Sequence, residues 1–180
     1  MKFVLAATLA AVIALAAPAS GLAQSTSGLA DTLNFIRDEI AAQGQINIVA
    51  NNRDPDTGQS WTNQTSHEGS NISADVDQCK INLHWRTVYN GKVDYDGDGW
   101  IAFAQVDHVS VLTLDQYFAH VNVVSGHPNW ITQTSPQLTV VTAVRSDGVE
   151  NIFYFADSDL ANSVAQAMRH AADLCGGTRQ

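Results

Sequence analysis

The chain has 180 residues, of which nine are Lys or Arg and eighteen are Asp or Glu, so its formal net charge at pH 7 is −9. Proteins that bind nucleic acids or anionic membranes rely on Lys and Arg, so this acidic composition argues against both partners. Hydrophobic residues make up 45% of the chain and charged residues 15%, which is typical of a folded protein. The length fits a single domain.

The first 23 residues have the organisation of a signal peptide. Lys2 is followed by an uncharged, Ala-rich run to Ala17, and small residues around Ala19 and Ala23 then offer cleavage sites. The run of about 15 residues is shorter than the ~20 that a membrane-spanning helix needs. We expect cleavage after Ala23, a mature domain over 24–180 with a net charge of −10, and a periplasmic or secreted protein without a transmembrane anchor.

The two cysteines, Cys79 and Cys175, are expected to form a disulfide. Thiols of exported proteins are normally paired, and these two are too far apart for a CxxC redox motif. A catalytic thiol is the alternative, but nothing near either cysteine in the sequence calls for an activated sulfur. The bridge would close a loop of about one hundred residues.

The mature chain opens with a pattern typical of an amphipathic helix followed by a hairpin. Apolar residues at helical spacing predict a helix over Leu29–Gln43. The period then changes to two, and the turn-forming segment 54–58 separates a strand that begins at Ile46 from a polar strand over 59–67. The clearest strand runs from Cys79 to Tyr89, where apolar and polar side chains alternate.

Turn-forming residues follow this strand. Asn90-Gly91 predicts a tight turn, and the Asp-Gly-Asp-Gly segment 96–99 predicts another before the chain returns through Trp100. Asp107-His108 then marks a further reversal into a strand.

The last third of the chain contains two helices and a hairpin. Thr113 and Gln116 have the spacing of a capping box, which predicts a short helix that ends at Gly126. Strands over 138–145 and 150–156 flank a Ser-Asp-Gly turn. A final helical stripe is capped near Asp157 or Ser158 and closed by Gly176-Gly177.

This order of elements predicts an α+β fold: an antiparallel sheet or open barrel with N-terminal and C-terminal helices and one short internal helix. Cys175 closes the final helix, so the disulfide would hold that helix against the sheet. A sheet closed by a C-terminal helix is similar in outline to pleckstrin-homology-like domains, although the N-terminal and internal helices depart from their simplest pattern. Such a likeness implies a fold and no activity.

The C-terminal residues carry a second resemblance. Residues 170–177 read HAADLCGG, which resembles the H-A-x-x-L-C-G-G ending of small exported bacterial proteins of unknown function. The match covers about one-twentieth of the chain. It implies export and no particular activity.

The segment that starts at Asp94 resembles the calcium loop of EF-hand proteins. Asp94, Asp96 and Asp98 occupy the alternate positions that supply ligand oxygens, and Gly99 stands where the loop turns sharply. The twelfth position is Gln105 instead of a bidentate Glu, and the flanks have strand patterns. The sequence therefore leaves two interpretations, a weak calcium site or a structural turn, and it indicates no other cofactor.

No catalytic residue is assigned from the sequence. His67, His108, His120 and His127 lack a diagnostic spacing such as HExxH and are interpreted as scattered surface residues. There is no G-x-S-x-G elbow and no glycine-rich phosphate loop. The four tryptophans could line a carbohydrate or lipid groove, but the alternation around Trp85 favours a place in the core.

The leading hypothesis is thus an exported, non-catalytic domain, a binding or envelope-associated module for an unknown protein or small molecule. One alternative is a small secreted hydrolase or metal-dependent enzyme that assembles His and Asp residues in space. Another is a carrier of a lipid or other apolar ligand within a curved sheet. A pocket that gathers His and Asp side chains would favour the enzyme, and an apolar cavity would favour the carrier.

Overall fold

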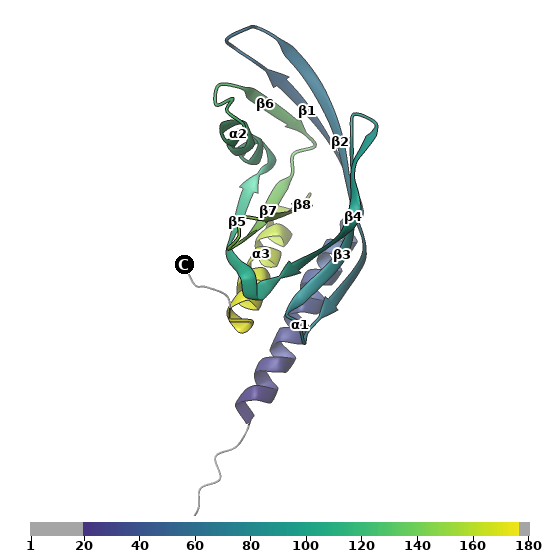
Figure 1. Cartoon of the computed structure of the whole chain (residues 1–180), viewed down its shortest axis with the longest axis vertical. Helices are drawn as coiled ribbons and strands as arrows, with labels where there is room; N and C mark the ends of the chain where they lie inside the picture. The colour runs from purple at the N-terminus through teal and green to yellow at the C-terminus, as the bar shows by residue number, and fades with distance from the viewer. Residues whose placement is uncertain (1–19, 177–180) are drawn as a thin grey trace, which may run out of the picture.

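The computed structural model describes residues 20–176, with side-chain surroundings from residue 28 onward. Three α-helices and two open antiparallel sheets make up this part of the chain (Figure 1). The α+β prediction with helices at both ends is therefore confirmed. The expected leader, 1–23, lies outside the described residues except for residues 20–23, which begin helix α1 (Ser20–Ala42).

The larger sheet has five strands in the order β4-β3-β2-β1-β6, and every neighbouring pair is antiparallel. Its strands are β1 (Gln45–Arg53), β2 (Ser60–Asp75), β3 (Lys80–Tyr89), β4 (Lys92–Ala102) and β6 (Ile131–Ser135). The predicted hairpin around 54–58 and the strand up to Tyr89 are confirmed. Strand β2 continues well beyond the polar segment 59–67 that the sequence indicated.

The smaller sheet has three strands in the order β5-β7-β8. They are β5 (Val106–Thr113), β7 (Thr139–Arg145) and β8 (Glu150–Phe155), and the hairpin between β7 and β8 was predicted. A short 3-10 turn, η1 (Phe103–Gln105), takes the chain from β4 of the large sheet into β5 of the small one. The reversal therefore lies at η1, and the prediction of a reversal at Asp107-His108, which is inside β5, is wrong.

Local capping defines the two later helices. In α2 (Leu114–Val124) the Thr113 hydroxyl accepts a hydrogen bond from the Gln116 backbone and the Gln116 side chain accepts one from the Thr113 backbone, so the predicted capping box is present. The Asp157 carboxylate caps α3 (Ser158–Leu174) by accepting from two backbone N–H groups. Within residues 20–176, no helix is both long and apolar enough to cross a membrane.

The main core lies where α1 and α3 pack against each other and against both sheets (Figure 1). Its fully buried large side chains include Leu33, Ile36, Ile81, Ile101, Phe103, Phe155 and Met168. The Cys79–Cys175 disulfide borders this core and joins the residue before β3 to the residue after α3, with a Cα–Cα distance of 5.9 Å. The predicted bridge, and its role in holding the last helix to the sheet, are confirmed.

Strand β6 was not predicted, because its mostly polar residues have no apolar face. Partly buried side-chain hydrogen bonds hold it in place: Asn122 of α2 donates to the Thr132 hydroxyl (3.1 Å), which donates to the Asn52 side chain of β1 (2.9 Å). The Asp115 carboxylate accepts from the backbone N–H of Thr134 at 3.0 Å. Burial makes these bonds necessary, because an unpaired polar group in the interior destabilises the fold.

Residues 96–99, which were predicted to form a turn, lie in the middle of β4 and pair with β3. That prediction is wrong. Asp96 stands opposite Arg86, Gly97 opposite Trp85, and Asp98 opposite His84. Aspartate and glycine are typical of turns, but here the neighbouring strand supplies partners for both the backbone and the carboxylates.

Candidate functional site

A cleft of about 520 Å³ opens between the inner face of the large sheet and strand β8 of the small sheet. Side chains of β2, β3 and β4 form one wall, and the turn before β8 together with β8 forms the other. The lining residues are His67, Leu83, Trp85, Thr87, Asp94, Tyr95, Gly99, Val149, Glu150, Asn151, Ile152, Phe153 and Tyr154. The cleft is large enough for a small molecule, and its lining is mainly apolar and aromatic, as is usual for ligand sites.

Trp85 forms part of the floor of this cleft, and glycines flank it on both neighbouring strands. Gly69 of β2 and Gly97 of β4 are its partners in the two strand registers. A Cβ added at Gly69 would stand 3.0 Å from the Trp85 ring, and one added at Gly97 would stand 3.2 Å from the Tyr95 hydroxyl. Both glycines therefore leave room for aromatic rings to lie across the sheet.

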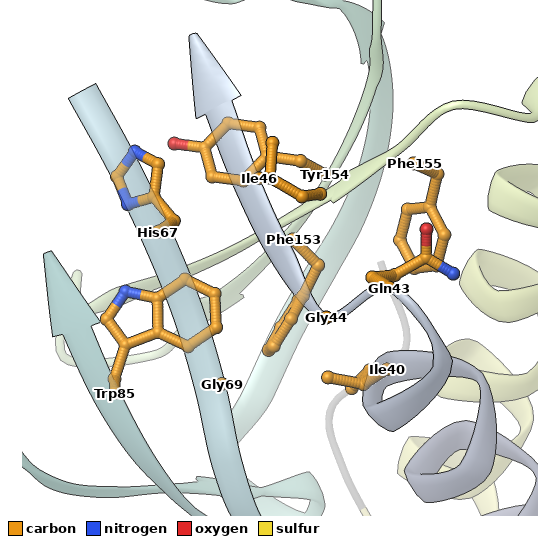
Figure 2. A pocket seen from close by; sticks show the side chains of 10 residues that line it. All are labelled: Ile40, Gln43, Gly44, Ile46, His67, Gly69, Trp85, Phe153, Tyr154 and Phe155. Atoms are coloured by element: carbon orange, nitrogen blue, oxygen red, sulfur yellow. The ribbon is translucent and has the colours of Figure 1, made fainter. Parts of the chain in front are cut away.

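His67 of β2 is enclosed by aromatic residues at the back of the cleft (Figure 2). Its ring stacks on Tyr154 with a centroid distance of 4.7 Å and lies 6.0 Å from the ring of Trp85. Its Nδ1 is 3.2 Å from the Thr87 hydroxyl. Burial lowers the pKa of His67 to about 4, so the ring is neutral at neutral pH. The expectation of a surface histidine is wrong at this position, because β8 of the other sheet covers it.

Tyr154 also keeps its proton. Burial is the main reason that the pKa of Tyr154 is raised, and the nearby Tyr117 and Glu150 raise it further. The pKa of Tyr117 is raised to about 12, again by burial first and by Glu150 second. The cleft thus presents the neutral imidazole of His67 and the neutral phenol of Tyr154 at physiological pH.

Beside the cleft lies a small inner pocket with a volume of about 10 Å³ (Figure 2). It shares His67, Trp85, Phe153 and Tyr154 with the cleft. It continues to Ile40 and Gly44 near the end of α1 and to Phe155 at the end of β8. This volume holds at most about one water molecule. A ligand would therefore occupy the cleft, and the packed side chains behind it would form a firm wall.

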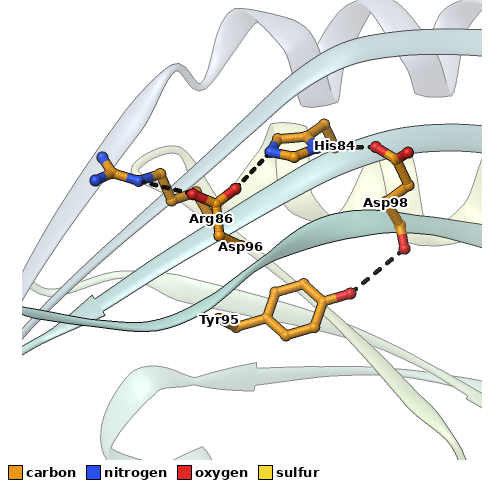
Figure 3. Close-up of polar contacts among 5 residues, drawn as sticks. All are labelled: His84, Arg86, Tyr95, Asp96 and Asp98. Atoms are coloured by element: carbon orange, nitrogen blue, oxygen red, sulfur yellow. Dashed lines mark hydrogen bonds and ion pairs between the residues drawn. The ribbon is translucent and has the colours of Figure 1, made fainter.

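The structure separates the three residues predicted to form a calcium loop. Asp94 lies apart from Asp96 and Asp98. Asp94 lies at a β-bulge between β3 and β4 and lines the cleft. The carboxylates of Asp96 and Asp98 are hydrogen-bonded to His84, which lies on the neighbouring strand β3 (Figure 3). Within residues 20–176, no group of three or more His, Cys, Asp or Glu side chains is placed to hold a metal ion. Calcium binding stays a prediction of the sequence.

The His84 cluster consists of His84, Arg86, Asp96 and Asp98 (Figure 3). His84 Nε2 is 2.8 Å from Asp96 Oδ1, and Nδ1 is 2.8 Å from Asp98 Oδ1. The hydrogen bond to Asp98, followed by the one to Asp96, raises the pKa of His84. Each ring nitrogen has its own carboxylate acceptor, an arrangement that suits a protonated ring bridging two acids.

The tryptophans do not share one groove. Trp61 and Trp130 form an edge contact at 4.7 Å, and His127 stacks on Trp130 at 3.8 Å. Trp100 is 49% exposed. Only Trp85 reaches the cleft.

Sequence reasoning singled out Asp94 and Trp85 but did not connect either with His67, Tyr95 or Tyr154. The alternation of β3 indicated that Trp85 belongs to an inward face, and that was the available signal.

Comparison with protein-family models, with curated proteins and with solved structures finds no significant match for this chain.

Proposed function

We propose that this chain is an exported, non-catalytic binding protein whose cleft takes a small, largely apolar ligand. The observation that carries the proposal is the cleft of about 520 Å³ lined by Trp85, Tyr95, Phe153 and Tyr154. Rings of this kind provide a large apolar contact area, and their few rotatable bonds limit the entropy lost on binding. The proposal unites the binding module and the apolar-ligand carrier considered from the sequence.

The proton chemistry of the cleft supports binding over catalysis. His67 is its one histidine, and with a pKa of about 4 it is a weak proton acceptor at neutral pH. Its ring nitrogen contacts a threonine hydroxyl, whereas catalytic histidines are usually oriented by a carboxylate. The phenol of Tyr154 holds its proton because its pKa is raised.

Two features support export. The first residues have the pattern of a signal peptide, and the disulfide is typical of proteins that mature in an oxidising compartment. The same bridge anchors the end of α3 beside β3, one of the strands that form the cleft. A cleft built on such a framework would bind with a small cost of ordering.

The test measures binding of Nile red, a neutral apolar dye, to the purified disulfide-bonded protein by fluorescence titration. Tyr95 lines the cleft and is 47% exposed, so we expect Tyr95→Ala to weaken binding about tenfold, which corresponds to ~1.4 kcal/mol. Tyr89→Ala is the matched control, because Tyr89 is on the same hairpin, is 42% exposed and does not line the cleft.

Thermal unfolding of both variants would show that they are folded. Saturable binding that falls in Tyr95→Ala and persists in Tyr89→Ala supports the proposal. Absence of saturable binding in the unmodified protein, or equal losses in the two variants, contradicts it.

A further inference from the structure

We propose that the cleft selects hydrophobic cations, compounds that join an apolar body to an ammonium group. The inference rests on the proposed function and names the ligand class of the same cleft. It is carried by the charges around the cleft together with the aromatic rings inside it.

The charged side chains of the cleft are all acidic. Asp94 of β4 and Glu150 of β8 belong to the two sheets that form its opposite walls, and both are exposed to solvent. Among the lining residues, every one of which is described, none is Lys or Arg. His67 adds no positive charge at neutral pH, because burial lowers its pKa to about 4.

The interior of the cleft offers surfaces that attract cations. Trp85 and Tyr95 contribute aromatic rings, and the faces of such rings carry partial negative charge and attract ammonium groups. The Tyr95 ring is held in place across Gly97, with its hydroxyl 3.4 Å from the Asp98 carbonyl oxygen (Figure 3). An ammonium group would thus meet aromatic rings within the cleft and carboxylates at its edges.

An anionic amphiphile would meet the opposite situation. A fatty-acid carboxylate or a phosphate group in this cleft would find no cationic partner among the lining side chains and would face Asp94 and Glu150. Like charges repel each other, and the two carboxylates at the edges of the cleft would therefore weaken the binding of an anion. The charges of the cleft therefore favour hydrophobic amines as ligands over the common anionic lipids.

Three ligands with the same ring test the inference: 1-naphthylmethylammonium, 1-naphthylmethanol and 1-naphthoate. Isothermal titration calorimetry with the purified, disulfide-bonded protein would measure the three affinities. We expect the ammonium compound to bind at least about fivefold more tightly than the alcohol, and the carboxylate to bind most weakly.

Variants locate the source of this preference. The double variant Asp94→Asn/Glu150→Gln should bring the affinity of the ammonium compound close to that of the alcohol. The control Glu68→Gln/Asp77→Asn removes the same charge from exposed positions outside the cleft and should keep the ratio of the unmodified protein.

The outcomes distinguish the two proposals. Equal affinities for ammonium and alcohol in the unmodified protein, or a ratio that falls equally in both double variants, overturns the charge selection while Nile red binding remains. If none of the three compounds binds, the charge selection is overturned as well. Failure of Nile red binding in the same preparation is what overturns the proposed function itself.

Discussion

The ring of Trp85 lies against the backbone of Gly69, so closely that a Cβ atom on this glycine would stand 3.0 Å from Cζ3 and 3.3 Å from Cε3 of the ring. The two residues are partners in the register of β2 and β3. This contact positions the indole as the floor of the cleft and allows His67, two residues earlier in β2, to lie beside it.

Gly69→Ala should therefore disturb the cleft floor. The new methyl group would push the Trp85 ring out of its position, and we expect the free energy of unfolding to fall by about 1–3 kcal/mol. Urea denaturation, followed by the emission of the tryptophans, would measure this change. Gly99→Ala is the control, since an added Cβ there meets nothing within 4 Å although Gly99 is on the same sheet and also lines the cleft. A loss as large for Gly99→Ala as for Gly69→Ala would refute the steric explanation.

Burial of His67 should make the protein sensitive to mild acid. The pKa of His67 is lowered from 6.5 to about 4 in the folded state, so the unfolded chain binds the extra proton first as pH falls. Stability from this residue is present at neutral pH and decreases below pH 6.5, with a loss of about 2 kcal/mol between about pH 7 and pH 5.

His67→Phe keeps an aromatic ring but cannot titrate, so its unfolding free energy should decline less over the same pH range. Carboxylates contribute to both curves, and the difference between the two proteins isolates the imidazole. An identical acid dependence in the two proteins would show that His67 is not the group responsible, and an NMR titration of its ring would give its pKa directly.

The His84 cluster should have the opposite pH dependence. The pKa of His84 is raised above 6.5 by hydrogen bonds to Asp98 and Asp96, so its stabilising effect is complete below pH 6.5 and is lost as pH rises through the raised value. We expect the difference in melting temperature between the unmodified protein and His84→Gln to shrink from about pH 6 to about pH 9. It should also shrink in about 1 M salt, because the cluster is exposed. The control is His170→Gln on the exposed surface of α3; a matching trend there would count against the cluster.

Loss of the disulfide should destabilise the whole domain. The bridge spans a sequence separation of 96 residues, and the chain-entropy argument assigns a closed loop of that length about 4–5 kcal/mol. The double variant Cys79→Ser/Cys175→Ser should unfold at a lower urea concentration, and dithiothreitol should lower the midpoint of the unmodified protein without affecting the variant. An unchanged midpoint on reduction would show that the bridge contributes little.

Local patterns in the sequence were sufficient for much of the fold. The alternation from Ile81 to Tyr89, the capping box of Thr113 and Gln116, and the Asp157 cap each depend on residues close in sequence, so a short segment contains the necessary information. The cysteines could be paired because the chain has only two. Strand β6 was not predicted, because its sequence has no apolar periodicity. Hydrogen bonds to residues far away in the sequence hold it in place.

The cleft required the tertiary structure. Alternation determines which residues of β3 share a face, but it does not reveal that β8 covers that face near His67. The sequence of residues 96–99 is compatible with a turn and with a strand. Only the pairing of this segment with His84 and Trp85 of β3 shows that it is a strand. The sequence by itself determined the three helices, most of the strands, the disulfide and the net charge, because these follow from local or counted properties. Only the tertiary structure decided which face of each strand meets the other sheet, because burial depends on segments far apart in the chain.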